Sequence, residues 1–117
     1  MLGAINLVPF FCLKFKIDMK KEINRKEFPM YRGLRKYFPD ALFEVSNVSF
    51  RATQQHHPNK EMHWNKEVSN DHLDCLERHL NDHAKGIKFD EDGSRHLAKV
   101  VWRALGALQI ELEEEKL

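Results

Sequence analysis

Three stretches in which apolar residues recur at three- and four-residue steps constrain this fold more than any other feature of the sequence. They span residues 39–53, 70–85 and 95–113. No stretch alternates apolar and polar residues with period two, and no glycine-rich phosphate loop is present. The sequence therefore predicts an all-α fold, a small bundle of three main helices with a long histidine-bearing loop and an N-terminal arm.

Residues with turn and capping preferences separate these helices. Pro39 suits the first turn of a helix, Ser69 and Ser94 are candidate N-caps, and Gly86 is a candidate C-terminal stop. The third helix ends in the acidic run 113–115, which is unfavourable at the negative end of a helix dipole. We therefore expect this last turn to fray.

The 117 residues are enough for one small domain. We expect a single helical domain over 37–113, a basic lead-in over 19–36 and an acidic tail over 114–117. Residues 1–18 form an apolar N-terminal extension that is too short to span a bilayer, for which about 20 apolar residues are needed. It is either an extension outside the functional domain or an arm that covers an apolar patch.

Composition excludes several classes of function. The net charge of +1 argues against direct nucleic-acid binding through a polybasic surface. Two cysteines exclude a disulfide scaffold and favour a reducing compartment, so we expect a cytoplasmic protein. The third helix has so wide an apolar face that three helices leave part of it uncovered, which predicts a homo-oligomer.

Histidines form the most unusual cluster in the sequence. All 7 lie within residues 56–96. His56, His57 and His63 lie, together with Trp64, within the aperiodic stretch 54–68. Loops of that length are often functional. His72, Cys75 and His79 lie at steps of three and four residues on one helix and could bind zinc. The zincin motif is absent, since His79 and His83 have its spacing but lack the Glu between them, so we do not expect a structural zinc. The simpler interpretation is that these histidines flank the core.

The chain resembles the phage-associated dATP/dGTP diphosphohydrolase N-terminal domain family, over roughly residues 33–113. The most specific motifs are Arg78–Leu80 and the Asp-Gly-x-x-His-x-Ala run that leads into the third helix, Asp92–Leu105. Weaker motifs, in the same order, are Gly33–Leu42, Gln55-His56, His63-Trp64, Ser69–His72 and Asp90–Gly93. The resemblance implies a small all-α protein of phage or prophage origin, distantly similar to MazG-like enzymes that split a nucleoside triphosphate into a monophosphate and pyrophosphate with Mg²⁺. The Glu-x-x-Glu and Glu-x-x-Asp pairs of those enzymes are not present here.

If the chain is such an enzyme, the residues divide into four roles. His79 or His96 is the general base, because an imidazole titrates near neutral pH. Trp64 stacks on the base of the nucleotide. The predicted Mg²⁺ ligands are Glu44, Asp74 and Glu77, and the predicted phosphate-binding cations are Arg78, Lys99 and Arg103. The alternative is a non-enzymatic helical phage accessory protein that binds a protein partner through its third helix.

Overall fold

The computed structural model describes residues 24–116, which belong to two compact units, the first ending at Tyr37 and the second beginning at Phe38. In the first unit, Tyr31–Arg35 forms the short π-helix η1, and none of its residues is buried. The predicted extension over residues 1–18 and the start of the basic lead-in lie outside the described residues.

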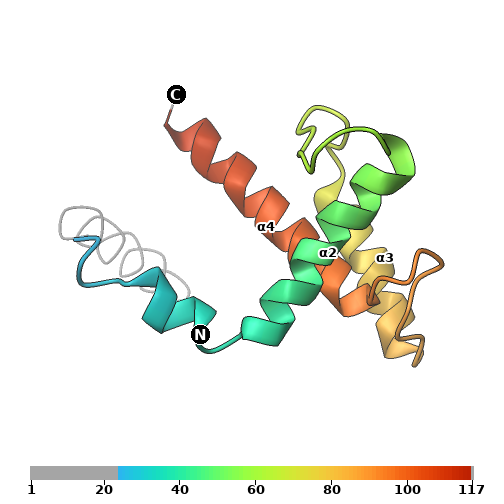
Figure 1. The fold of residues 1–117 in the computed structure, drawn as a ribbon, viewed down its shortest axis with the longest axis horizontal. Helices are drawn as coiled ribbons and strands as arrows, with labels where there is room; N and C mark the ends of the chain where they lie inside the picture. Colours follow the sequence, from blue (N-terminus) through green and yellow to red (C-terminus); the bar gives the residue numbers. More distant parts are fainter. Residues whose placement is uncertain (1–23, 117) are drawn as a thin grey trace, which may run out of the picture. The chain divides into compact units, whose positions relative to one another are not determined.

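The second unit holds three helices, α2 (Pro39–His56), α3 (His72–Ala84) and α4 (His96–Glu115), shown in Figure 1. Between residues 24 and 116 there is no strand, and the single β-bridge joins Phe89 to Arg95. The prediction of an all-α fold with three main helices is therefore confirmed.

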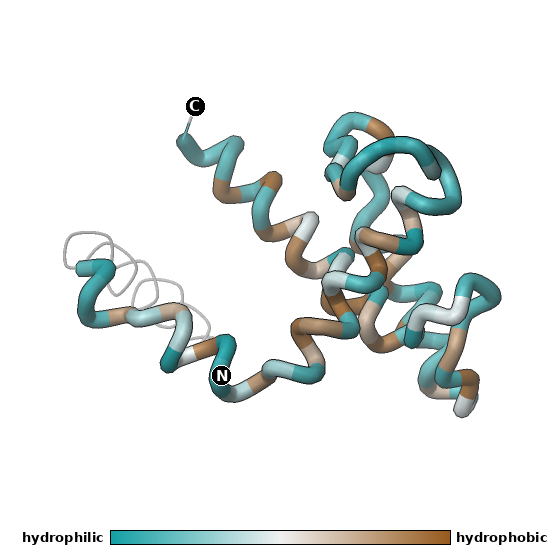
Figure 2. Tube along the Cα trace, in the orientation of Figure 1, coloured by the Kyte–Doolittle hydropathy of each residue, from teal (hydrophilic) through white to brown (hydrophobic). Residues whose placement is uncertain are grey.

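Helix α4 is the element on which the other two helices pack, α3 more extensively than α2. The core is small: Val45 and Val48 of α2 meet Ala98 of α4, and Trp102 packs against them. The C-terminal half of α4 extends away from α2 and α3 (Figure 1), and apolar residues continue along it (Figure 2). The packed part of the unit is thus the crossing of the three helices.

The end of α2 shows how a single proline sets a helix boundary. The apolar period predicted an end at residue 53, but the helix continues to His56. His57 leaves the helical region, with φ −143° and ψ 67°. Pro58 follows it, and the ring of a proline disfavours the helical conformation of the residue before it.

The two predicted serine caps were wrong. Asp71 and Arg95 occupy the N-cap positions of α3 and α4, and neither forms a side-chain capping bond. Ser94 is instead almost completely buried, and its Oγ accepts a hydrogen bond from Arg51 of α2 at 3.2 Å. Its hydroxyl therefore joins two helices rather than capping one.

The connection between α3 and α4 is a tight turn that uses two glycines with positive φ, Gly86 at 88° and Gly93 at 87°. Ile87 N–H donates to the carbonyl of Asp82, which is the closing bond expected after a helix that ends at glycine. The predicted stop at Gly86 is thus confirmed. After the turn, His96 N–H donates to the carbonyl of Lys88 at 2.9 Å, which fixes the first residue of α4.

The acidic end of α4, where the sequence predicts fraying, is helical in the structure. The helix continues to Glu115, and Glu113 accepts hydrogen bonds from Lys66 at 2.6 Å and from Gln109 at 2.9 Å. These two donors, Lys66 first, lower the pKa of Glu113. Lys66, in the long loop between α2 and α3, therefore neutralises part of the negative charge at the C-terminal end of α4.

Candidate nucleotide cavity and histidine centre

The loop between α2 and α3 borders a cavity of about 450 Å³. Trp64 and His63 of the loop, His72 at the start of α3, and Trp102 and Arg103 of α4 line it. The cavity is large enough for a small organic ligand, since such sites usually measure about 300–1,000 Å³. Two further histidines at the end of α2, His56 and His57, complete the basic part of its lining.

Trp64 is held in this lining by contacts on several sides. Its ring lies edge-on to that of Trp102, with centroids 6.1 Å apart, and 6.2 Å from the ring of His72. The ammonium of Lys66 lies 5.2 Å from the centroid of the Trp64 ring, within the range of a cation–π contact. Because Lys66 also pairs with Glu113, the loop is anchored to α4 from both sides of the tryptophan.

His72 connects the cavity to the contact between α3 and α4. Its side chain is buried, and its Nδ1 lies 3.2 Å from Nη1 of Arg103, which can only donate. Burial, and then the positive charge of Arg103, lower the pKa of His72 against the opposing effect of Asp71. His72 is therefore neutral near pH 7, and the hydrogen bond from Arg103 places its proton on Nε2. That nitrogen is buried and has no hydrogen-bond partner among residues 24–116.

The lining of the cavity has the chemical character that suits an anion. Its lining contains Arg103 and four histidines, and no carboxylate among the described residues. Within residues 24–116, Arg103 makes no ion pair with Asp or Glu, so its charge is not compensated by an acid. A guanidinium without an acidic partner beside a cavity is suited to bind phosphate oxygens.

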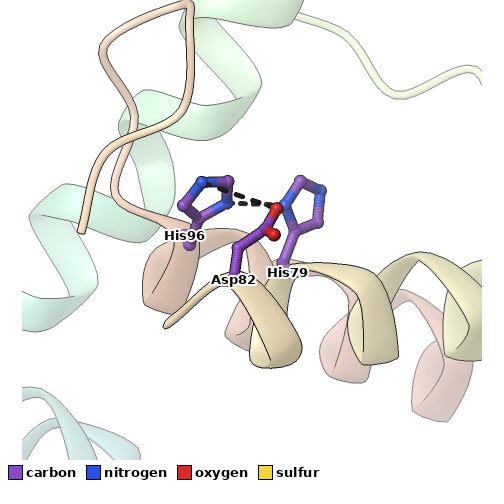
Figure 3. A group of neighbouring side chains, drawn as sticks. All are labelled: His79, Asp82 and His96. Carbon is purple, nitrogen blue, oxygen red and sulfur yellow. Dashed lines mark hydrogen bonds and ion pairs between the residues drawn. The ribbon is translucent and has the colours of Figure 1, made fainter. Parts of the chain in front are cut away.

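A second group of polar side chains lies where α3 meets the first turn of α4 (Figure 3). Nδ1 of His79 and Nδ1 of His96 are 2.9 Å apart, and Nε2 of His96 is 3.8 Å from Oδ2 of Asp82. His96 is buried, whereas His79 and Asp82 are half-buried. Burial, followed by the charge of Lys99, lowers the pKa of His79, so His79 is largely uncharged near pH 7.

Lys99 lies next to this group but is paired with acids of the turn before α4. Its Nζ is 2.6 Å from Oδ2 of Asp90 and 3.1 Å from Oδ2 of Asp92. The hydrogen bond from Lys99 is the largest cause of the lowered pKa of Asp90. Burial acts to raise the pKa of Asp92, but the bonds from Ser94 N–H and Lys99 outweigh it and lower that pKa.

Comparison with known proteins identifies the family. Residues 18–117 match the family described as dATP/dGTP diphosphohydrolase, N-terminal. The chain belongs to this family. No curated protein and no solved structure gives a significant match. None of the helices within residues 24–116 combines the length and the apolar character that crossing a membrane requires.

Of the residues predicted for substrate binding, the structure of this diphosphohydrolase domain brings two together at the cavity, Trp64 and Arg103. Lys99 is occupied by Asp90 and Asp92, as described above. Arg78 is exposed, donates to Sγ of Cys75 at 2.9 Å and lies 3.9 Å from Asp71. The predicted bases His79 and His96 contact each other and do not line the cavity.

The predicted metal ligands are not gathered. Asp74 and Glu77 are exposed on α3, and Glu44 lies half-buried on α2. Within residues 24–116, histidine, cysteine and carboxylate side chains converge in a group of three only at His79, Asp82 and His96, where one ligand atom from each lies within 4.8 Å of the others. The alternative zinc set of His72, Cys75 and His79 is likewise not gathered there.

Sequence reasoning missed several residues of both sites. Among the histidines of the cavity, the sequence gives His56, His57 and His63 no individual role, and it gives His72 only that of a possible zinc ligand. The aperiodic loop was the signal that could have singled out His63. Asp82 gave no signal beyond its three-residue separation from His79, because its relation to His96 depends on how the following turn folds.

Proposed function

We propose that this domain binds a purine deoxynucleoside triphosphate in the cavity and hydrolyses it to the monophosphate and pyrophosphate. The observation that carries the proposal is the convergence of Trp64 and Arg103 on one cavity whose described lining has no carboxylate. An aromatic ring and an uncompensated guanidinium match the two chemically different ends of a nucleotide. Membership of the dATP/dGTP diphosphohydrolase family gives the reaction class.

In this proposal the rings of Trp64 and Trp102 contact the base, since an aromatic side chain can stack on any nucleobase. Arg103 donates to the phosphate oxygens, and its contact with Nδ1 of His72 orients the guanidinium. Water attacks the α-phosphorus, the bond to the bridging oxygen breaks, and pyrophosphate leaves. Arg103 stabilises the negative charge that develops during this step.

The water must give up a proton to a base within reach of the cavity. His63 lies on the lining, and its Nδ1 is 3.0 Å from the carbonyl oxygen of Glu61. A carbonyl only accepts, so Nδ1 carries the proton and Nε2 is free to accept one. His63 is therefore the base that this geometry favours. His79 and His96 remain the bases predicted from the sequence. The hydrolysis assay below distinguishes His63 from the base at the α3–α4 contact by comparing His63→Gln with His79→Gln.

A Mg²⁺ ion held by side-chain carboxylates does not fit the cavity, because the described lining contains no Asp or Glu. The predicted ligands Glu44, Asp74 and Glu77 lie off this lining. Any Mg²⁺ at the cavity would therefore have to be carried by the triphosphate itself.

Binding can be followed directly, because both tryptophans of the chain line the cavity. Titration with dATP or dGTP is expected to change the tryptophan fluorescence, and Arg103→Gln should weaken binding at least tenfold, in line with the loss of a charged hydrogen bond. Arg95→Gln is the matched control, because Arg95 lies over the ring of Phe89 and not on the cavity. An equal loss in both variants, or no fluorescence change with any deoxynucleotide, would contradict the proposal.

Hydrolysis is measured as pyrophosphate released from each deoxynucleoside triphosphate in the presence of Mg²⁺. His63→Gln should lower the rate at least a hundredfold, with little effect on the fluorescence titration, since base catalysis contributes about 10²–10⁴-fold. His83→Gln is the control on α3. A loss in His79→Gln but not in His63→Gln would assign the base to the α3–α4 contact instead.

The alternative, an accessory protein that binds a protein partner, is favoured by the exposed leucines of α4, Leu105, Leu108 and Leu112. It predicts tryptophan fluorescence that does not respond to nucleotides, so the same titration decides between the two functions.

A further inference from the structure

We propose that His79, Asp82 and His96 bind one divalent first-row transition-metal ion. This site is separate from the nucleotide cavity, whose lining contains none of the three residues. The inference goes beyond the proposed function and does not depend on it.

The spacing of the two imidazoles is the first support. Nδ1 of His79 and Nδ1 of His96 are 2.9 Å apart, and their rings are inclined by 35°. Two nitrogens that each lie about 2.1 Å from one ion are separated by about 3.0 Å when the angle at the ion is a right angle, and by about 3.4 Å when it is tetrahedral. The observed distance is close to the right-angle value, so a tetrahedral ion requires the two nitrogens to move apart by about 0.5 Å.

The third donor is close enough to join them. Oδ2 of Asp82 lies 3.8 Å from Nε2 of His96, the ring nitrogen that does not face His79, so the carboxylate must turn to reach an ion between the two Nδ1 atoms. One ligand atom from each residue nevertheless falls within 4.8 Å of the other two. The side chain of Asp82 is 38% exposed, whereas that of His96 is 5% exposed. A fixed, buried imidazole and a movable carboxylate at the surface provide both a rigid ligand and a path by which an ion enters.

The donor set determines the kind of ion. Two imidazole nitrogens and one carboxylate oxygen suit Zn²⁺, Fe²⁺, Co²⁺ or Ni²⁺, whereas Mg²⁺ prefers oxygen ligands alone. Three protein ligands also leave coordination positions for water or a substrate oxygen.

The surrounding fold holds these side chains in place. His79 and Asp82 are three residues apart on α3 and therefore share a face of the helix. His96 begins α4, and the hydrogen bond from its N–H to Lys88 fixes its backbone. Asp90 and Asp92, which pair with Lys99, lie in the turn that precedes His96. The positive charge of Lys99 is therefore compensated before a cation binds.

The competing explanation is a hydrogen bond between two neutral imidazoles, with Asp82 accepting weakly from His96. Both explanations account for the 2.9 Å distance. They differ in metal binding, which only the first one predicts.

The test uses the full chain without an affinity tag, treated with a chelator and dialysed against Zn²⁺, Co²⁺ or Mg²⁺ without nucleotide. Bound metal is measured by elemental analysis, and the coordination of Co²⁺ by its visible absorption spectrum. We expect one Zn²⁺ or Co²⁺ per chain, no retained Mg²⁺, and a higher Tm with Zn²⁺.

His79→Gln and Asp82→Asn should each weaken binding at least tenfold. His83→Gln and Asp74→Asn are the matched controls on the same helix, and both should bind as the unaltered chain does. Cys75→Ser excludes a thiolate ligand, which would also be visible in the Co²⁺ spectrum. Since His79 and Asp82 are half-buried, circular dichroism is used to verify that their variants remain folded.

Three results would overturn the proposal: no bound transition metal, binding that His79→Gln and Asp82→Asn leave unchanged, or retention of Mg²⁺ as strong as that of Zn²⁺. None of these three results bears on whether Arg103→Gln weakens nucleotide binding in the fluorescence titration. A failure of the metal site and a failure of the proposed function are therefore distinguishable.

Discussion

Lys99 and Arg103 lie one turn apart on α4, yet the structure gives their charges opposite uses. Lys99 is neutralised by Asp90 and Asp92, while Arg103 contacts the neutral ring of His72. Arg95, one turn earlier, lies over the ring of Phe89 at 4.8 Å. The four-residue spacing of Arg95, Lys99 and Arg103 by itself predicts one cationic stripe on the helix. Spacing alone cannot show which cation an acidic turn will pair, so the partner of each charge could not be predicted.

The pairing of Lys99 predicts how stability depends on pH. The lowered pKa values of Asp90 and Asp92 mean that these carboxylates stabilise the fold above about pH 4, and that this contribution is lost as the pH falls through their folded-state pKa values. Lys99→Met should lower the free energy of unfolding at pH 7 by about 1–3 kcal/mol. The variant should also show a weaker loss of stability below about pH 4 than the unaltered chain.

Urea unfolding at pH 7, 5 and 3 measures both effects. Lys88→Met is the control, because this exposed lysine lies in the same connection and its side chain makes no ion pair among the described residues. Equal losses in the two variants would show that the lysine pairing contributes nothing specific.

At the scale of the elements, the approach of α3 to α4 depends on Gly106. A Cβ atom at this position would lie 3.0 Å from Cε1 and 3.2 Å from Nδ1 of the His72 ring. The glycine is therefore used for a close approach in the middle of a helix, where it costs about 1 kcal/mol relative to alanine. Apolar periodicity predicted the helix but gave no reason for this residue.

This contact predicts that Gly106→Ala has different effects on stability in two backgrounds of a double-mutant cycle. Gly106→Ala should fail to stabilise the protein and should weaken nucleotide binding, because the His72 ring must shift away from Arg103. In a His72→Ala background the same substitution should raise the free energy of unfolding by about 1 kcal/mol, since only the helix propensity then remains. Urea unfolding of the four proteins measures the cycle. The same effect of Gly106→Ala in both backgrounds would show that the two residues do not interact.

Most of the elements themselves were predictable. The three helices follow from apolar periodicity, Gly86 ends α3 through its positive φ, and Pro58 accounts for the end of α2. The sequence could not show that the two predicted serine caps would be absent. The hydroxyl of Ser94 accepts a hydrogen bond from Arg51, a residue 43 positions away. The local preference of serine for an N-cap position is overridden when burial and a distant hydrogen-bond donor determine where its side chain lies.

At the scale of the whole molecule, the small core implies a further contact. Val45, Val48, Cys75 and Ala98 are the buried apolar residues of the part described, whereas Leu105, Leu108 and Leu112 of α4 are 48%, 49% and 44% exposed. Exposed apolar rows of this kind mark association surfaces. We therefore propose that the protein is a homo-oligomer that covers this face of α4 with a second copy.

Light scattering at micromolar concentration should give a mass that is a multiple of 13.9 kDa. Leu108→Glu should shift the mass toward that of one chain, because it places a charge in the contact. Leu73→Glu, a substitution of an equally large exposed leucine on α3, is the control. A mass of one chain for the unaltered protein would contradict the proposal.

The sequence by itself determined the helical elements, the start of α2 at Pro39, the stop at Gly86 and the family, because each depends on residues close together along the chain or on their order. Only the tertiary structure decided which side chains meet. Trp64 and Arg103 reach one cavity, and His79 and Asp82 reach His96, through a loop and a turn whose paths set the approach of the helices. Helical periodicity places a side chain on a face of its own helix, whereas the partner across that face depends on packing and on backbone geometry between the helices.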